Sequence, residues 1–363
     1  MTQERREGLL GALGPPRNPQ RWRALTRRRL PPTGLRAILN GVTVAPARTI
    51  LVASPRGFCA GVSYAIGIVD LVMKRQGRPT YVRHEIVHNR HVVEQFRAQG
   101  ARFVDDLATV PEGSRLIFSA HGVSPAVRDE ATQRRLRVVD ATCPLVTRVH
   151  RQALKYAREG FEILLVGHRG HVEVEGTLGH APDQIHVVET VEDVASLSVR
   201  DPKRVAVVTQ TTLSVDDTRA ILEAIRERFP SVRTPPKDDI CYATQNRQAA
   251  VKALAGQSQL VLVIGSPTSS NANRLVEVAG SEGTAARLIE DAKDIDASWV
   301  AGVGVVGLTA GASTPESLVE EAIGRLLALG FAAVRELQTA EENVTFPLPR
   351  ELRNECATPP SRL

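Results

Sequence analysis

Residues 138–158 read VVDATCPLVTRVHRQALKYAR, and this stretch decides the fold. A short β-branched run ends in small polar residues, and Cys143 then precedes Pro144, which suits the first turn of a helix. Val146, Val149 and Ala153 follow at helical spacing. The stretch therefore predicts a buried strand that leads through a cysteine into an amphipathic helix.

The same pattern occurs twice more along the chain. Cys59 follows the run 50-ILVAS and a Pro-Arg-Gly turn, and apolar residues behind it recur at helical spacing. Cys241 follows Asp-Asp-Ile and precedes the helical segment 242-YATQNRQAAVKALA. Because backbone N–H groups and the helix dipole stabilise anions at a helix N-terminus, the pattern places three thiolates in favourable positions. Three modules with one cysteine each are expected around a common centre.

Between and beyond these cysteines, continuous apolar runs alternate with helical patterns such as 215–228 and 315–329. Continuous runs are typical of strands that are buried on both faces, and the alternation predicts parallel sheets with helical crossovers. The expected fold class is α/β, with three similar lobes of mostly parallel sheets. The expected divisions are an extension at 1–48, lobes at 49–143, 144–237 and 238–350, and a tail at 351–363.

The composition excludes several classes of protein. The chain has 363 residues, of which 42% are hydrophobic and 24% charged, as in ordinary globular proteins. No apolar run reaches the length of about 18 residues that a membrane span needs. Residues 1–48 carry ten arginines against Glu4 and Glu7, so the net charge of +6 leaves the remainder near −2. Neither a membrane nor a nucleic-acid partner is expected for this near-neutral body.

The Arg- and Pro-rich extension 1–48 is expected to be disordered. It is either a dispensable extension or a targeting peptide, and an organelle is the expected location only in the second case. Four cysteines are too few for a disulfide scaffold at this length, which favours a reducing compartment such as a bacterial-type cytoplasm. Cys356 lies in the polar tail and is interpreted as an exposed thiol.

Three cysteines near one centre are compatible with zinc, with an iron–sulfur cluster or with no metal. Zinc needs a fourth ligand, such as a histidine. A [4Fe–4S] cluster normally takes four cysteines, so three would leave one iron open to a substrate. Three unrelated buried thiols are the alternative without a metal, because free cysteine packs well as a small hydrophobe. Spacing alone leaves these three alternatives open.

Polar segments follow several of the predicted strands, among them Thr-Gln-Thr-Thr, Ser-Ser-Asn and Ala-Gly-Ala-Ser. Ligands gather at the carboxyl ends of parallel strands, and these groups suit a phosphate or diphosphate. Glu173 beside His171 is either a general acid or a solvated surface glutamate. His84 and His88 match the HExxH pattern of zinc hydrolases, but the pattern follows a strand and has a β-branched centre, whereas its chemistry needs a helix.

Together these segments resemble one family closely. The matching stretches are 54-SPRGFCAGV, 81-YVRHEIVHNRHVV, 118-FSAHGVS, 140-DATCPLVTRVH, 170-GHVEVEGT, 209-TQTTLSVDDT, 238-DDICYATQNRQ, 269-SSNANRL and 309-TAGAS. The chain is identified from them as a member of the LytB/IspH family of 4-hydroxy-3-methylbut-2-enyl diphosphate reductases, over residues 49–350. Arg169, Val172 and Pro267 stand where the family more often has other residues.

The resemblance implies roles for particular residues around a central iron–sulfur cluster. The implied ligands of one [4Fe–4S] cluster with an open iron site are Cys59, Cys143 and Cys241. The implied proton donor is Glu173. The implied substrate contacts are His88, His121, His171, Thr211, Ser269, Ser270, Asn271 and Ser313. The diphosphate is expected to be held by neutral donors and protonated histidines rather than by lysines.

The implied reaction is a two-electron reductive dehydroxylation of the allylic diphosphate alcohol, in which the open iron makes the hydroxyl a better leaving group. The products are isopentenyl diphosphate and dimethylallyl diphosphate, at the last step of the methylerythritol phosphate pathway. The implied electron donor is a ferredoxin or a flavodoxin. The alternatives are a non-catalytic member that keeps the fold, and remotely a zinc hydrolase that uses His84 and His88.

Overall fold

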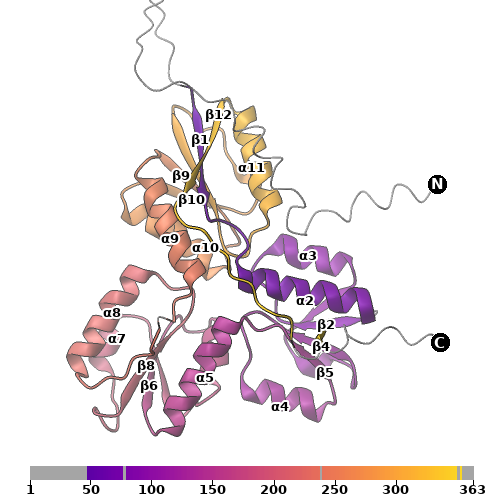
Figure 1. Ribbon diagram of the computed structural model, residues 1–363, viewed down its shortest axis with the longest axis vertical. Helices are drawn as coiled ribbons and strands as arrows, with labels where there is room; N and C mark the ends of the chain where they lie inside the picture. Colours follow the sequence, from indigo (N-terminus) through magenta and orange to yellow (C-terminus); the bar gives the residue numbers. More distant parts are fainter. Residues whose placement is uncertain (1–46, 77–78, 238, 350–351, 354–363) are drawn as a thin grey trace, which may run out of the picture.

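Three α/β lobes lie at the corners of a triangle (Figure 1). The structure is a computed structural model, and it describes residues 47–76, 79–237, 239–349 and 352–353. Each lobe has its own parallel sheet, so the fold class expected from the sequence is confirmed. Of the expected disordered extension 1–48, residues 1–46 lie outside the described residues, as does Cys356. Arg48 is described, and its guanidinium donates to the carbonyls of Val303 at 2.9 Å and Leu329 at 2.8 Å in the third lobe.

The first lobe contains a four-stranded sheet in the order β3-β2-β4-β5. Its strands are β2 (Thr80–Arg83), β3 (Ala101–Val104), β4 (Arg115–Phe118) and β5 (Arg137–Asp140). Its helices are α2 (Ala60–Gln76), α3 (Arg90–Ala98) and α4 (Pro125–Gln133), with a 3₁₀ turn η3 (Leu107–Thr109). All pairs in the sheet are parallel, so the carboxyl ends of its strands meet at one edge.

The second lobe contains a three-stranded parallel sheet in the order β7-β6-β8. Its strands are β6 (Glu162–Val166), β7 (Ile185–Val188) and β8 (Val205–Thr209). Its helices are α5 (Pro144–Arg158), α6 (Val172–Leu178), α7 (Val191–Ser196) and α8 (Val215–Arg228). Strands β6 and β8 are buried at every position, as continuous apolar runs predict.

The third lobe has a five-stranded parallel sheet in the order β10-β9-β11-β1-β12. Its strands are β1 (Thr49–Ser54), β9 (Leu260–Ile264), β10 (Ala285–Ile289), β11 (Val305–Ala310) and β12 (Ala333–Gln338). Its helices are α9 (Tyr242–Ala255), α10 (Ser270–Ser281) and α11 (Glu316–Ala328), with a 3₁₀ turn η4 (Ala292–Asp294).

The placement of β1 corrects the expected boundary of the first lobe at residue 49. This strand pairs with β11 and β12 rather than with the strands that follow it in the chain. The physical reason is burial, since Ile50 and Val52 complete one core of the third lobe while Leu51 and Ala53 complete another. The sequence shows that 50–53 is apolar but does not show which sheet needs it.

Beyond β12, the chain crosses from the third lobe to the first. Thr339 donates through its backbone N–H to the carbonyl of Ser54 at 2.8 Å. Farther along, Leu348 and Leu352 pack against the core of the first lobe. The expected third lobe of 238–350 therefore ends in a strap, residues 339–349, that ties two lobes together. Figure 1 shows this strap as the yellow trace across the middle of the molecule.

No helix among the described residues has the length and hydropathy needed to cross a membrane.

Candidate functional site

The three predicted cysteines stand at the N-termini of three helices. Cys143 is the N-cap of α5, Cys241 is the N-cap of α9, and Cys59 directly precedes α2. Each of these helices turns one end toward the middle of the triangle in Figure 1. The sequence prediction of one cysteine at each helix N-terminus is therefore confirmed. Helix N-termini favour negative charge, so at each of the three positions the helix dipole acts in favour of a thiolate.

The cysteine side chains meet at one centre. A methyl group placed on Gly61 would lie only 2.5 Å from Cys143 Sγ, so this glycine leaves room for that sulfur, and it would contact Cys59 Sγ at 3.9 Å. Burial, with a smaller effect from Cys59, raises the pKa of the Cys143 thiol to about 12 and that of Cys241 to about 11. Charged thiolates at this centre therefore need a positive partner.

The backbone of each cysteine is anchored to the end of a neighbouring strand. The three N–H groups donate from Cys59 to Ala312 O at 3.2 Å, from Cys143 to Ala120 O at 2.9 Å and from Cys241 to Thr211 O at 3.0 Å. Ala120 directly precedes His121, and Ala312 directly precedes Ser313. Thr211 is itself a predicted site residue. Every cysteine is thus fixed next to a segment that carries a predicted substrate contact.

Three imidazoles bring the first and second lobes together. His88 follows β2, His121 follows β4, and His171 is the N-cap of α6. The rings of His88 and His121 stack with their centroids 4.1 Å apart, and His171 meets them edge-on at 5.6 Å and 6.2 Å. The structure therefore assembles the three histidines that the sequence singled out.

Hydroxyl groups join the third lobe to the other two. Ser313 Oγ donates to the carbonyl of His88 at 2.8 Å, which connects the third lobe to the first. Thr212 Oγ1 lies 3.2 Å from Ser270 Oγ, which connects the second lobe to the third. Together with the imidazoles, these contacts close a ring around the centre of the molecule. We call the predicted substrate contacts on this ring the polar wall: His88, His121, His171, Thr211, Ser269, Ser270, Asn271 and Ser313.

Asn271 and His88 each keep a polar atom without a partner. The Asn271 side chain is 4% exposed and accepts from Ala312 N at 2.8 Å, while its Nδ2 has no hydrogen-bond partner among the described residues. His88 Nδ1 lies 3.1 Å from Glu85 Oε2, while its Nε2 is buried and equally without a described partner. Buried polar atoms are normally paired, so both atoms point to a polar ligand.

Glu173 is a buried acid rather than a surface glutamate. Its side chain is 3% exposed, and its carboxylate accepts from Thr211 N at 2.7 Å and from Thr211 Oγ1 at 3.0 Å. Burial raises the pKa of Glu173 to about 7, although the two hydrogen bonds from Thr211 oppose the shift. A carboxyl group with this pKa holds a proton near neutral pH and can donate it.

Two histidines of the polar wall are neutral imidazoles in the absence of an anion. Burial, reinforced by the neighbouring imidazoles, lowers the pKa of His171 to about 4 and that of His121 well below its usual value. The expectation of protonated histidines concerns the diphosphate complex and stays a prediction; in the ligand-free protein the low pKa values favour neutral rings. His171 Nδ1 accepts from Glu173 N at 3.1 Å, so the neutral ring carries its hydrogen on Nε2 and remains a donor.

The HExxH pattern does not form a zinc site. His84 and His88 lie in the loop between β2 and α3, and His84 has a φ of +58°. The two histidines have different partners, since His84 Nδ1 lies 2.6 Å from Asp105 Oδ1 whereas His88 Nδ1 lies 3.1 Å from Glu85 Oε2. Since the pattern requires both histidines on one helix face, the zinc hydrolase alternative has no geometric support.

Arg247 is a residue that sequence reasoning missed. Its side chain on α9 is fully buried, and its guanidinium donates to the carbonyl of Gly57 at 2.7 Å and 3.2 Å. It also forms an ion pair with Glu342 of the strap at 3.0 Å. Arg247 thereby connects the turn before Cys59, the helix after Cys241 and the strap. A lone arginine in an amphipathic helix gives no signal of these distant partners.

The departures from the family pattern leave the polar wall intact. Arg169 forms ion pairs with Glu189 at 2.5 Å and with Asp193 at 3.2 Å, at the start of α7. Val172 is the first residue of α6, and the carbonyl of Pro267 accepts from the Asn273 side chain at 2.8 Å. None of these contacts involves a residue of the polar wall or a cysteine.

Comparison with known proteins agrees with this geometry. A model of the LytB protein family matches residues 50–327. The chain belongs to the LytB family. Among its LytB relatives, a 4-hydroxy-3-methylbut-2-enyl diphosphate reductase of Azoarcus sp. is 58% identical and covers 84% of this chain and 97% of the relative. A protein of Burkholderia mallei named as reductase 2 of the same type is 56% identical and covers 86% of this chain and 96% of the relative.

A solved LytB structure has the same fold. The E-1-hydroxy-2-methyl-but-2-enyl-4-diphosphate reductase from Plasmodium falciparum is 39% identical and has a TM-score of 0.83. The match covers 86% of this chain and 98% of that one. The family resemblance predicted from the sequence motifs is therefore confirmed.

The donor set fits an iron–sulfur cluster better than a single metal ion. In the part of the chain that the structure describes, no group of three or more His, Cys, Asp or Glu side chains could hold one ion. A cluster differs because each thiolate binds a different iron, so its ligands lie farther apart than those of one ion. Three thiols on separate helix N-termini match that requirement, and the irons would supply the positive charge that the thiolates need.

Proposed function

We propose that this chain reduces 4-hydroxy-3-methylbut-2-enyl diphosphate to isopentenyl diphosphate and dimethylallyl diphosphate. The single observation that carries the proposal is the closed ring in which the three cysteines and the polar wall surround one buried acid, Glu173. The reaction consumes two electrons and two protons, breaks the allylic C–O bond, forms a C–H bond and releases water. Membership of the LytB family supports this assignment.

The polar wall binds the diphosphate in this proposal. Within the polar wall, Asn271 Nδ2 and His88 Nε2 are buried and lack partners among the described residues, and a phosphate oxygen would satisfy each of them. His171 offers its Nε2 hydrogen, and Ser269 and Ser270 stand at the N-terminus of α10, which favours an anion. An arriving dianion would also raise the pKa values of the neighbouring imidazoles, so binding is coupled to proton uptake.

Glu173 delivers a proton as the C–O bond breaks. With a pKa of about 7, Glu173 carries the proton in a large fraction of molecules near neutral pH, far more than an exposed glutamate would. Thr211 holds both carboxylate oxygens through its N–H and hydroxyl groups, so the acid is oriented before the substrate arrives. Once Glu173 is ionised, the same two hydrogen bonds stabilise the carboxylate, which then recovers its proton from solvent.

Cys59, Cys143 and Cys241 would hold one [4Fe–4S] cluster with an open iron site. When bound, the cluster supplies electrons to the substrate and a Lewis-acidic position for its hydroxyl group. Gly61 leaves space for the Cys143 sulfur, and the three backbone anchors fix the spacing of the ligands. The free thiols also favour a reducing compartment, and we propose the cytoplasm of a bacterial cell.

The proposal is tested by anaerobic turnover of the full chain. Protein reconstituted with iron and sulfide is mixed with the allylic diphosphate alcohol and dithionite-reduced methyl viologen. Viologen oxidation with formation of both isomeric diphosphates is expected. Protein that carries the full complement of iron and sulfide but forms neither product would contradict the proposal and favour the non-catalytic alternative.

A further inference from the structure

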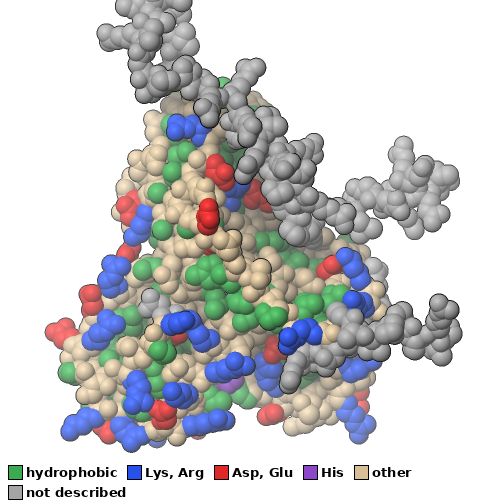
Figure 2. Space-filling model, in the orientation of Figure 1, with side chains coloured by type: hydrophobic (Ala, Val, Ile, Leu, Met, Phe, Trp, Pro, Cys, Tyr) green, Lys and Arg blue, Asp and Glu red, His purple; other side chains and the backbone are tan. Residues whose placement is uncertain are grey.

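One face of helix α5 is strongly basic. Arg148, Arg151, Lys155 and Arg158 recur at intervals of three and four residues, which places them on one side of the helix. Between Pro144 and Arg158 the helix carries no acidic residue. We call these four residues the basic stripe. Figure 2 shows Lys and Arg side chains gathered over the second lobe, in the lower part of the view.

The basic stripe is a local asymmetry and not the average character of the body. The charge outside the first 48 residues is near −2, so other surfaces must be neutral or acidic. Helix α11 illustrates the contrast, because it carries Glu316, Glu320 and Glu321 against one arginine, Arg325. Arg151 and Lys155 are like charges four residues apart, which destabilises a helix slightly, whereas Lys155 and Arg158 lie in the last turn, where the helix dipole favours cations.

Two of the four stripe residues have acidic partners, since Arg148 lies 3.8 Å from Asp239 and Lys155 lies 3.9 Å from Glu159. Glu159 is shared between Lys155 at 3.9 Å and Arg233 at 2.5 Å. Neither Arg151 nor Arg158 has an ion pair in the described part of the chain, and both are exposed. Cationic side chains that are solvated and unpaired are available to an acidic partner.

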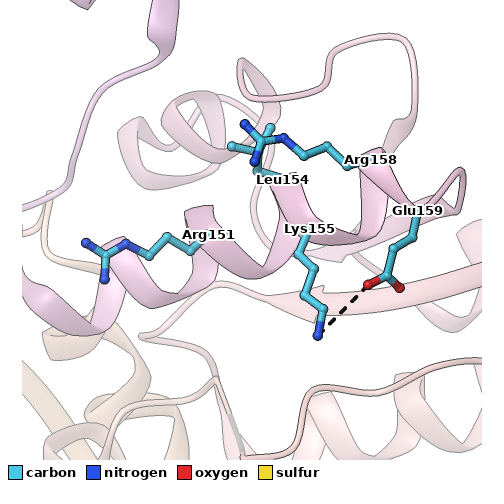
Figure 3. A pocket seen from close by; sticks show the side chains of 5 residues that line it. All are labelled: Arg151, Leu154, Lys155, Arg158 and Glu159. Carbon is cyan, nitrogen blue, oxygen red and sulfur yellow. Dashed lines mark ion pairs between the residues drawn. The ribbon is translucent and has the colours of Figure 1, made fainter.

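An open depression lies on the stripe. It has a volume of about 340 Å³ and is lined by Arg151, Leu154, Lys155, Arg158 and Glu159. Figure 3 shows the cationic side chains extending from successive turns of α5, with the Glu159 carboxylate beside Lys155. Leu154 adds an apolar surface between the charges. Apolar contact within a basic rim is the composition expected of a transient protein interface.

The basic stripe leads directly to the cysteine centre. Cys143 is the N-cap of α5, and Arg148 lies about 8 Å farther along the helix axis. The Arg148 guanidinium lies 3.8 Å from Asp239, two residues before Cys241. A redox group held over the N-terminal half of the stripe would therefore be close to two of the three cysteines.

We propose that the basic stripe of α5 is the docking surface for a small acidic electron-carrier protein. This inference rests on the proposed function, whose reaction takes two electrons for each substrate. Each docking event oxidises one carrier by one electron, so two events supply the two electrons that one turnover consumes. The stripe spans about 15 Å, which suits the small interfaces of transient electron-transfer complexes. Electrostatic steering would speed the encounter and would weaken as salt is added.

The test compares two electron sources for the same reconstituted full-length protein. One source is a bacterial flavodoxin kept reduced by its NADPH-dependent reductase, and the other is dithionite-reduced methyl viologen. The variants are Arg151→Glu and Arg158→Glu on the stripe. Arg335→Glu is the matched control, because Arg335 is an exposed arginine on β12 in another lobe. Binding of oxidised flavodoxin at low salt is measured in parallel by calorimetry.

The stripe variants are expected to lose about tenfold in kcat/KM with flavodoxin and to bind it about tenfold more weakly. A tenfold loss corresponds to about 1.4 kcal/mol for one charge reversal at the docking site. Viologen-driven turnover of the stripe variants and all turnover of the control should stay within about twofold of wild type, because viologen does not need the docking site. Equal flavodoxin kinetics in stripe and control variants would overturn the docking site. Binding of a duplex oligonucleotide is measured on the same variants. If the stripe variants lose that binding while their flavodoxin kinetics are unchanged, the partner is a nucleic acid and the docking proposal is overturned.

Absence of viologen-driven turnover in the wild type would instead contradict the proposed function. The calorimetry would still decide whether flavodoxin binds the stripe.

Discussion

The two halves of the central site differ in how they are built. On one side, three thiols of a single chemical type stand at three equivalent helix N-termini. On the other side, the polar wall combines imidazole, amide and hydroxyl groups that hold one another across the lobes. The cysteine half repeats one local arrangement, a cysteine at a helix N-terminus, three times. The polar half forms only when the three lobes pack against one another.

This difference predicts two kinds of failure. A cysteine has no substitute, because each thiolate would be bonded to its own iron. The residues of the polar wall contact the substrate together, so the loss of one of them should weaken substrate binding and leave the cluster in place. The expected effects therefore decrease from the cysteines through Glu173 and Asn271 to Thr211.

The largest effect is expected for Cys143→Ser, because a serine hydroxyl does not replace a thiolate on iron. Iron and sulfide should fall far below the wild-type content after anaerobic reconstitution, and turnover should be lost. Metal analysis together with the visible absorption of the cluster measures the effect. Cys356→Ser is the control and should keep a full cluster. Equal iron in both variants would remove Cys143 from the ligand set.

Glu173→Gln is expected to keep the cluster and lose about 10²- to 10⁴-fold in kcat, which is the usual contribution of a positioned general acid. The amide has nearly the same shape but no proton to donate to the substrate. Anaerobic single-turnover kinetics with reduced viologen measures the loss, and iron content serves as the internal control. Near-wild-type turnover would show that another group delivers the proton.

Asn271→Ala is expected to raise KM by about 10- to 100-fold, because a hydrogen bond to a charged group contributes about 1.5–3 kcal/mol. The cluster content should not change. Steady-state kinetics with varied substrate measures KM, and binding of inorganic diphosphate provides a second readout. An unchanged KM would mean that the buried Nδ2 is not directed at the diphosphate.

The smallest effect is a shift of the pH profile in Thr211→Val. In the wild type, Glu173 has a pKa of about 7, so kcat should be high below this pH and should fall as pH rises through it. Loss of the Thr211 hydroxyl removes a hydrogen bond that favours the carboxylate, so the pKa should rise and the falling limb should move to higher pH. If the fall of kcat occurs at the same pH in Thr211→Val as in the wild type, a group other than Glu173 causes the observed pH dependence.

The sequence was informative where function depends on local patterns. The cysteines were found because a strand run, a cysteine and a helical pattern are adjacent in the chain. The residues of the polar wall were found because the ends of parallel strands collect ligands and because the motifs resemble the LytB family. These features need only a few consecutive residues to be recognised.

Other features depend on distant partners and could not be predicted. The strands β3, β10 and β12 lie at sheet edges and are only partly buried, so their sequences lack a continuous apolar run. Strand β1 joins a sheet whose other strands begin more than 200 residues later. The bonds of Arg247 to Gly57 and Glu342 likewise span long stretches of chain.

The neutral state of His121 and His171 was also out of reach of sequence reasoning. Their pKa values fall because the folded lobes bury both rings next to other imidazoles. Residue type alone gives a histidine a pKa near 6.5, which suggested protonated donors. Burial is a property of the assembled ring and so becomes visible only in the structure.

The central claim is that three cysteines at helix N-termini hold one iron–sulfur cluster beside the polar wall. The most direct test is to measure iron, acid-labile sulfide and zinc per chain in full-length protein purified without oxygen. About four iron and four sulfide per chain, with no zinc, is the predicted result. About one zinc without sulfide, or no metal even after anaerobic reconstitution, would contradict the claim.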